Sequence, residues 1–388
     1  MKAHRRIVLF GTVLATLGGL TTLVVPVVGG SDLVNTTLHA AAATPARPVT
    51  AALPAALRQI WSAPGVPPRA GSPLPTDTTH SSVVAVAGSH GIEGRSLLDG
   101  AIVWSYERRN AALCDWTLQQ DLVLVAFRKL DGCRDLVALD AGTGVRRWYR
   151  TAEIDADITL YAAPALLVAA NSRGLAAFDT GGGLTRWTFG RPGCTLAPPI
   201  LGDQGVALLL ACAGRPPSLV LLDTYSGKER WKLPVPMTGI DPRVLAADTD
   251  VTVLTRSGGA AVITAYDNSG RRLSATGIGV RYGTASQVAT MVHNGVVVGW
   301  TGRQVFAAAT AGTPLWTADG TGPAVGDGPV VLLAGPGPLT ERDPRSGRVV
   351  RTIPRPAGSA GPEDVGRLGS SLVTITTAGT IVLGGTPR

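Results

Sequence analysis

The four cysteines are the residues of this chain with the clearest capacity for chemistry, because thiols form disulfides and bind metal ions. Cys114 and Cys133 are 19 residues apart, and Cys194 and Cys212 are 18 residues apart. Four cysteines allow three disulfide connectivities, and the parallel spacing favours two local bridges, one in each pair. The alternative is a metal site made by all four sulfurs, which requires the two pairs to meet in space.

Other residue types that perform catalysis are sparse. The five histidines show no metal-ligand spacing, and neither a G-x-S-x-G nor an S-x-x-K pattern marks a nucleophile. The glycine-rich stretch 320–326 contains proline and precedes no predicted helix, so it is interpreted as a turn rather than a phosphate-binding loop. The net charge of +8 comes from scattered arginines, without the aromatic-interleaved basic run typical of nucleic-acid grooves. The sequence therefore predicts no catalytic, cofactor-binding or metal-binding residue, no cofactor and no nucleic-acid partner.

The N-terminus predicts an exported protein. A basic flank is followed by residues 7–28, which are 22 residues without a charged side chain. That length spans a bilayer core of roughly 30 Å as a helix, and the basic flank stays in the cytoplasm. We therefore expect residues 1–28 to be an uncleaved signal anchor in the bacterial cytoplasmic membrane, with the rest of the chain on the extracytoplasmic side. A cleaved signal, with small residues at 41–43, is the alternative and would give a secreted protein.

Residues 29–57 are rich in Ala, Pro and Thr and nearly free of acidic residues. This composition is typical of a flexible linker. We expect it to tether a folded domain, residues 58–388, to the membrane.

The body repeats one phrase: an apolar strand, Asp, a glycine-containing turn and then Trp. Its clearest copies are residues 138–148, 178–187 and 222–231. The last turn glycine recurs at intervals of 35 to 44 residues, at Gly100, Gly144, Gly183, Gly227, Gly270, Gly312 and Gly347. Four positions later stand Trp104, Trp148, Trp187, Trp231, Ser274, Trp316 and Arg351.

Short apolar runs such as 122–126 and 136–139 precede each turn, and they are too brief for helices. Units of about 40 to 50 residues with four strands each are typical of β-propeller blades. The C-terminus holds an incomplete unit, whereas Trp61 belongs to a strand without a unit. Pairing the two closes the ring and predicts eight four-stranded antiparallel blades, although the short last interval leaves seven blades open.

The motif Ala-x-Asp-x-x-Thr-Gly-x-x-x-Trp at 138–148 resembles the tryptophan-docking repeat of the PQQ-like, or quinoprotein-type, β-propeller family. The resemblance covers residues 58–388 and is partial where Trp is missing. It implies an all-β fold in which a Trp of each blade docks between adjacent blades. The docking residues would then be Trp61, Trp104, Trp148, Trp187, Trp231 and Trp316.

Quinone-dependent dehydrogenases of this family are longer and use a calcium ion and two adjacent cysteines. This chain has no adjacent cysteines, so the resemblance points away from them. It is closer to the BamB-type propellers, which are non-enzymatic scaffolds of envelope assembly, although no cysteine is placed here for lipid attachment.

We therefore expect a monomeric, non-enzymatic propeller that binds an envelope protein. A sensor for a small ligand or glycan in the central channel, and an enzyme with a site scattered over loops, remain alternatives. Within the repeat, each cysteine pair falls in one unit, the second and the fourth, which supports intra-blade disulfides in an oxidising compartment.

Overall fold

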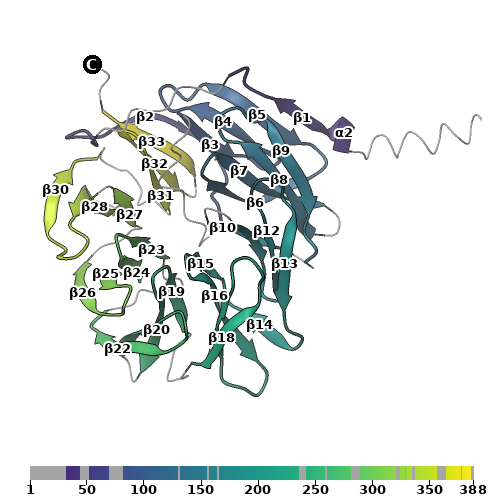
Figure 1. The fold of residues 1–388 in the computed structure, drawn as a ribbon. Helices are drawn as coiled ribbons and strands as arrows, with labels where there is room; N and C mark the ends of the chain where they lie inside the picture. The colour runs from purple at the N-terminus through teal and green to yellow at the C-terminus, as the bar shows by residue number, and fades with distance from the viewer. Residues whose placement is uncertain are drawn as a thin grey trace, which may run out of the picture.

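In the computed structural model, short neighbouring strands pair antiparallel to form eight sheets, and the sheets are arranged in a closed ring (Figure 1). The structure describes residues 32–43, 52–69, 82–129, 132–154, 157–163, 166–235, 242–257, 260–280, 289–301, 303–319, 324–327, 329–333, 337–355, 364–376 and 378–385.

Blades 2 to 5 each run from an inner strand to an outer strand in chain order. Their strands are β6 (Ala112–Gln119), β7 (Leu122–Lys129), β8 (Gly132–Asp140) and β9 (Arg146–Thr151); β10 (Thr159–Ala163), β11 (Leu166–Ala170), β12 (Gly174–Phe178) and β13 (Thr185–Gly190); β14 (Cys194–Leu196), β15 (Ile200–Gly202), β16 (Gly205–Cys212), β17 (Ser218–Leu222) and β18 (Glu229–Pro234); and β19 (Arg243–Ala247), β20 (Val251–Ser257), β21 (Ala260–Tyr266) and β22 (Arg272–Ile278).

Blades 6 and 7 follow the same order, and blades 8 and 1 combine distant parts of the chain. Their strands are β23 (Ala289–His293), β24 (Val296–Trp300), β25 (Gln304–Ala309) and β26 (Pro314–Asp319); β27 (Ala324–Asp327), β28 (Val330–Leu333), β29 (Leu339–Arg342) and β30 (Val349–Ile353); β31 (Asp364–Leu368), β32 (Ser371–Thr376), β33 (Gly379–Gly384) and β2 (Arg58–Ala63); and β3 (Val83–Ala87), β4 (Gly91–Ser96), β5 (Ile102–Arg108) and β1 (Thr36–His39), the last preceded by α2 (Asp32–Asn35).

The core lies between the blades. Among the described residues, buried apolar side chains form a separate cluster at each of the eight interfaces between adjacent blades. The middle strands are buried along almost their whole length, as in β11 and β16. Near-continuous apolar runs therefore occur because both faces of each sheet are covered.

Blade 8 closes the ring with strands from both ends of the chain. β2 pairs antiparallel with β33, and Trp61 lies opposite Val382. The structure thus confirms eight blades and the predicted pairing of the strand at Trp61 with the C-terminal unit, and the seven-blade alternative is wrong. Such closure hides the sheet edges that the two ends would otherwise expose.

The turns that precede the Trp positions share one construction. In blade 2, Asp140 Oδ1 accepts hydrogen bonds from Thr143 N at 2.9 Å and Thr143 Oγ1 at 2.8 Å. Gly144 has φ of 72°, and a β-bulge follows in the pairing of β8 with β9. Asp223 and Asp343 hold the same turns through Ser226 and Ser346. An Asp, a hydroxyl residue and Gly therefore encode this tight turn.

Two parts of the predicted linker pack against the ring. β1 lies outside β5 and extends blade 1, whereas in the next six blades the strand at the Trp position is outermost (Figure 1). Further along, Leu53 and Leu57 are buried between blades 7 and 8. Parts of the tether expected over 29–57 thus pack against the domain, and the composition hid them because an Ala-, Pro- and Thr-rich segment is typical of a linker.

The predicted membrane-spanning segment, residues 7–28, lies outside the described residues. In the part of the chain that the structure describes, no helix has the length and apolarity needed to cross a bilayer.

Candidate interaction surface

The cysteines form two disulfides within blades. Cys114 of β6 is bonded to Cys133 of β8 in blade 2, and Cys194 of β14 is bonded to Cys212 of β16 in blade 4. The predicted pairing is confirmed, and a shared metal site of four thiolates is excluded. With sequence separations of 19 and 18, each bridge contributes on the order of 2–4 kcal/mol by restricting the unfolded chain.

Each Trp of the repeat reaches from its own blade to the next one. Trp104 Nε1 donates a hydrogen bond to Ala141 O at 3.0 Å, in the turn of blade 2. Every other Trp position donates to the corresponding turn of the following blade: Trp61 to Leu97 O, Trp148 to Thr180 O, Trp187 to Thr224 O, Trp231 to Asn268 O and Trp316 to Pro344 O. These residues are structural staples.

The turn glycine serves the staple as well as the turn. A Cβ on Gly144 would lie 2.7 Å from the Trp104 ring, and one on Gly227 would lie 2.4 Å from the Trp187 ring. Glycine is therefore required both by the positive φ and by the close approach of the preceding Trp. The sequence pattern marks the turn glycine but gives no sign of the close approach of the ring.

Two interfaces have no Trp. Between blades 5 and 6, Ser274 Oγ donates to Ala311 O at 2.6 Å and so retains the hydrogen bond without the ring. Between blades 7 and 8, Arg351 Nη1 donates to Leu53 O at 2.8 Å while its Nε binds the carboxylate of Glu341. Leu53 and Leu57 supply the apolar contact at this interface.

The histidines do not converge. His90 Nδ1 donates to Ala111 O at 2.8 Å, and His293 belongs to blade 6. Positions 4 and 80 lie outside the described residues. Across the described ranges, no group of three or more His, Cys, Asp or Glu side chains is placed to hold a metal ion.

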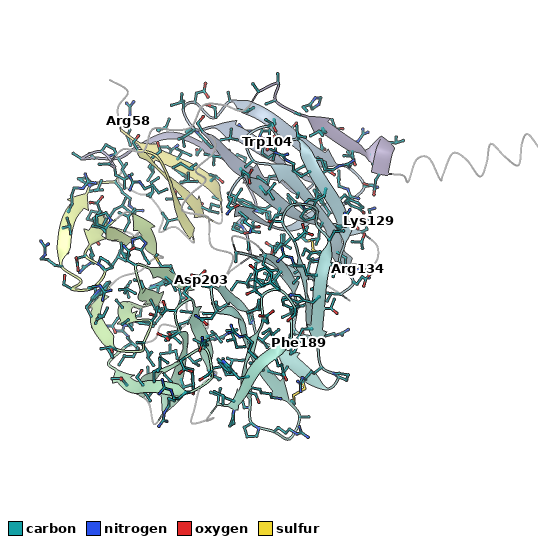
Figure 2. The ribbon with its side chains drawn as sticks, in the orientation of Figure 1. Arg58, Trp104, Lys129, Arg134, Phe189 and Asp203 are labelled. Atoms are coloured by element: carbon teal, nitrogen blue, oxygen red, sulfur yellow. A yellow bond between two sulfur atoms is a disulfide. The ribbon has the colours of Figure 1, made fainter. Side chains whose placement is uncertain are left out.

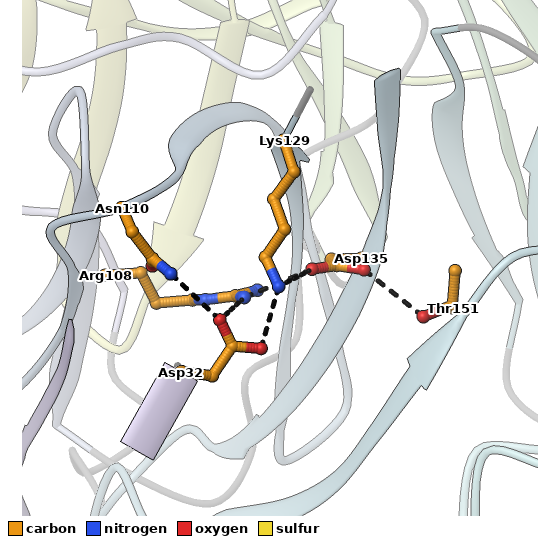
Figure 3. A network of polar contacts seen from close by, with 6 residues as sticks. All are labelled: Asp32, Arg108, Asn110, Lys129, Asp135 and Thr151. Atoms are coloured by element: carbon orange, nitrogen blue, oxygen red, sulfur yellow. Dashed lines mark hydrogen bonds and ion pairs between the residues drawn. The ribbon is translucent and has the colours of Figure 1, made fainter. Parts of the chain in front are cut away.

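The polar side chains at the outer edge of blades 1 and 2 form a network around α2, which we call the docking network (Figure 3). The Asp32 carboxylate accepts from Arg108 Nη2 at 2.9 Å, Lys129 Nζ at 2.8 Å and Asn110 Nδ2 at 3.1 Å. Asp135 binds the same two cations, each at 3.1 Å, and Thr151. Two carboxylates thus balance two cations.

Protonation states in the docking network follow from these contacts. Burial by itself raises the pKa of Asp32, but the hydrogen bonds from Lys129, Asn110 and Arg108 outweigh it and lower the pKa to about 2. Burial also opposes the charge of Lys129, yet the bonds to Asp32 and Asp135 raise its pKa. Asp32, Lys129 and Arg108, whose pKa is also raised, therefore remain ionised at neutral pH, and none of the three is suited to proton transfer there.

Arg108 is the centre of this network and is only 1% exposed. Its guanidinium lies 5.1 Å from the ring centroid of Phe127 and 5.6 Å from that of Tyr149. Its Nε and Nη1 are buried without a hydrogen-bond acceptor. The aromatic faces hold the cation in place, and Asp32 and Asp135 use only Nη2.

A second polar cluster joins blades 2 and 3 on their inner strands. Asp115, 1% exposed, accepts from Arg69 N, Trp116 N and Leu160 N at 3.0, 2.8 and 2.8 Å. Burial nevertheless raises the pKa of Asp115, and burial together with the Asp115 charge raises the pKa of Tyr161 to about 12. Perturbed carboxylates often mark active sites, but this one is saturated by backbone donors and closed to a substrate.

Two carboxylates meet at the inner turns of blades 4 and 5. Burial raises the pKa of Asp248, and the charge of Asp203 raises it further. Figure 2 shows Asp203 toward the inside of the ring and Arg58 toward its outside. Among the residues that the structure describes, no third His, Cys, Asp or Glu joins this pair to form a metal-binding group.

Sequence reasoning missed the docking network and the Asp115 cluster. The partners are far apart in the chain, and the Lys129–Asp32 bond joins residues 97 positions apart. The one local signal was the run Thr36–His39, whose β-branched residues suit a strand.

Comparisons with known proteins agree with the ring. Residues 91–254 match the family model described as outer membrane protein assembly factor BamB, a stretch that begins with β4 and ends in β20. No curated protein matches the sequence.

Solved structures share the fold. BamB from Moraxella catarrhalis is 17% identical with a TM-score of 0.55 over 85% of this chain and 100% of that one. The computationally designed protein Ika8 is 15% identical with a TM-score of 0.57, over 86% of this chain and 100% of that one. The C-terminal WD40 domain of Sif2 is 11% identical with a TM-score of 0.53, over 86% and 99%. The structural likeness shows the propeller fold, and within residues 91–254 the family model agrees with the resemblance of the repeat to the PQQ-like β-propeller family.

Proposed function

We propose that this protein is a non-enzymatic scaffold of the bacterial cell envelope, held at the cytoplasmic membrane by residues 7–28 with the propeller on the extracytoplasmic side. The observation that carries the proposal is the match of residues 91–254 to a model described as an assembly factor. An assembly factor acts by binding other proteins, and a propeller offers many loops on a rigid ring for that purpose.

The use of the polar side chains supports a binding role over catalysis. In the described ranges, every buried charged side chain holds segments of the fold together: Arg108, Asp115, Asp135 and Glu341. Both oxygens of Asp115, the most buried carboxylate with a raised pKa, accept backbone hydrogen bonds. A general acid or base needs a free position facing a substrate, and these groups lack one.

The two disulfides support the extracytoplasmic location. Such bridges persist in oxidising compartments and are rare in the cytosol. The uncharged stretch 7–28, with its basic flank, supports the single-pass anchor. We propose no cofactor, no metal and no nucleic-acid partner, and a monomeric propeller.

The test is mild crosslinking of the full-length protein in native membranes, followed by affinity capture and quantitative mass spectrometry. The scaffold proposal expects one envelope protein in near-equal amount to the bait. Residues 1–57 alone serve as the matched control, because they carry the anchor without the ring.

Two results would contradict the proposal. Capture of the same protein by the control bait would assign binding to the anchor. Capture of nothing, with the propeller folded and membrane-bound, would remove the scaffold role. Protease added to intact spheroplasts checks the location separately, because an extracytoplasmic propeller is digested and a cytoplasmic one is protected.

A further inference from the structure

We propose that the outer edge of blade 1 is a binding site for a peptide in which a helical turn that carries a carboxylate leads into an extended strand, and that residues 32–39 are its intramolecular occupant. The inference depends on the proposed scaffold function in one respect only, namely that the partner is an envelope protein. It adds the partner's chemistry: an acidic turn followed by a short strand.

The occupant is not part of the repeat. β5 carries Trp104, and in the next six blades the strand at the Trp position is the outermost strand. In blade 1, β1 instead covers the outer edge of β5. The two strands pair in antiparallel register, from Thr36 opposite Arg108 to His39 opposite Ser105. Blade 1 therefore holds a bound strand at an edge that neighbouring blades leave uncovered by any described strand.

Backbone pairing holds β1 to this edge. The side chains of β1 are half-buried or exposed, and Leu38 is 40% exposed. Just before the strand, Arg109 N donates to Asn35 O at 2.9 Å, and Arg109 Nη2 donates to Val34 O at 2.9 Å. Main-chain pairing at a sheet edge tolerates many sequences, as in other cases of β-strand addition. A strand from another protein can make the same ladder.

The docking network supplies the selectivity. Arg108, Asn110 and Lys129 converge on the single carboxylate of Asp32 at 2.9, 3.1 and 2.8 Å. These donors are positioned by blades 1 and 2, and the rings of Phe127 and Tyr149 hold Arg108 rigidly. Bonds to a charged acceptor are stronger than neutral ones, so the site requires an acidic residue before the strand.

The intramolecular occupant does not use the site fully. Arg108 Nε and Nη1 are buried with no acceptor. A buried donor without a partner carries a free-energy cost, and an acidic peptide with a further acceptor near its carboxylate relieves it. Such a partner can compete with residues 32–39, and its binding would release the segment that leads to the predicted anchor.

The test uses the full-length protein in detergent and a fluorescent synthetic peptide of residues 31–43. The double variant Asp32→Ala/Thr37→Pro detaches the protein's own segment and leaves Arg108, Asn110 and Lys129 in place. We expect this variant to bind the peptide at least about tenfold more tightly than the wild type, whose edge is occupied. We expect Asp32→Asn in the peptide to weaken binding about tenfold through loss of a charge-assisted contact.

The matched control is Asp32→Ala/Thr37→Ala, which keeps a strand-compatible residue and therefore retains more of its own segment at the edge. Equal peptide binding by wild type and double variant, both with native circular dichroism, would overturn the inference. So would equal binding of the Asp and Asn peptides.

If the double variant does not fold, hydrogen exchange of the β5 amides in full-length Asp32→Asn decides the question. Faster exchange than in wild type supports a displaceable strand, and unchanged exchange refutes it. Peptide binding without capture of an envelope protein would keep this inference and reject the scaffold function, whereas capture without peptide binding would do the reverse.

Discussion

Six interfaces between blades are closed by a Trp, and two are closed without one. The stapled interface of blades 1 and 2 has Trp104, 1% exposed and bonded to Ala141 O. The interface of blades 5 and 6 has the short Ser274, which keeps the hydrogen bond but not the ring. The comparison separates two functions of the Trp side chain. Its hydrogen bond orients the side chain toward the turn of the next blade, and its buried ring adds stability.

The interface of blades 7 and 8 shows a third solution. Blade 8 has no turn between β33 and β2, because these two strands come from opposite ends of the chain. Arg351 takes the Trp position and bonds to Leu53 O, and Leu53 and Leu57 fill the interface. A segment that precedes the repeats thus replaces the turn that an unbroken blade would offer.

The largest expected effect comes from removing a staple. Trp104→Ala deletes a fully buried ring and should lower the free energy of unfolding by about 3–5 kcal/mol. Ser274→Ala removes only one hydrogen bond and should cost about 1 kcal/mol. Guanidinium unfolding followed by far-UV circular dichroism measures both. Equal losses would show that the ring contributes nothing beyond its hydrogen bond.

The next prediction concerns the interface of blades 7 and 8, which has no Trp. Leu53 is 2% exposed, so Leu53→Ala should lower the free energy of unfolding by about 2–5 kcal/mol. Leu98, which is 79% exposed, provides the control, and Leu98→Ala should change stability by less than about 0.5 kcal/mol. The same unfolding measurement applies. A negligible effect at Leu53 would return residues 52–57 to the status of a linker.

A smaller effect separates the two requirements on the turn glycine. Gly144 and Gly214 have φ of 72° and 69°, but only at Gly144 would a Cβ meet a Trp ring; at Gly214 nothing lies within 4 Å. Gly214→Ala should cost about 1–2 kcal/mol for backbone strain. Gly144→Ala should cost about 1–3 kcal/mol more, because Trp104 must move. Equal melting temperatures would mean that the ring shifts freely.

The sequence predicted the parts of this fold that are encoded over short distances. The Asp-x-x-Thr-Gly turn and the following Trp lie within eleven residues, and their period counts the blades. Cys114 and Cys133 lie in one unit, so their pairing could be predicted too. Even the pairing of distant ends was predictable, since one strand and one incomplete blade remained unpaired.

The remaining features depend on contacts that leave no periodic signal. Arg351 bonds to a residue 298 positions away, where an Ala- and Pro-rich composition pointed to a linker. Asp32 precedes any recognisable repeat, and its partners in blades 1 and 2 are ordinary surface-type residues in the sequence. Composition describes the average of a segment, whereas a single well-placed carboxylate or leucine can dock it.

The smallest expected effects concern two carboxylates. Asp115 lies inside an interface that a Trp closes, and Asp32 lies at the edge of blade 1 that β1 covers. Asp115, between blades 2 and 3, has a raised pKa because it is buried, so its ionisation costs stability at neutral pH and acidification relieves that cost. Asp32 has a pKa lowered to about 2, so its contribution is complete above the usual Asp range and disappears as the pH falls toward 2.

The two carboxylates should therefore respond to acid in opposite directions. The melting temperature of wild type relative to Asp115→Asn should rise as the pH falls from 7 to about 4, the usual Asp pKa. The melting temperature relative to Asp32→Asn should decline between pH 4 and about 2. Differential scanning fluorimetry across this range measures both. Parallel curves for the three proteins would show that neither carboxylate has a different pKa in the folded and unfolded chain. The charge of Asp32 in the docking network would then contribute nothing to stability.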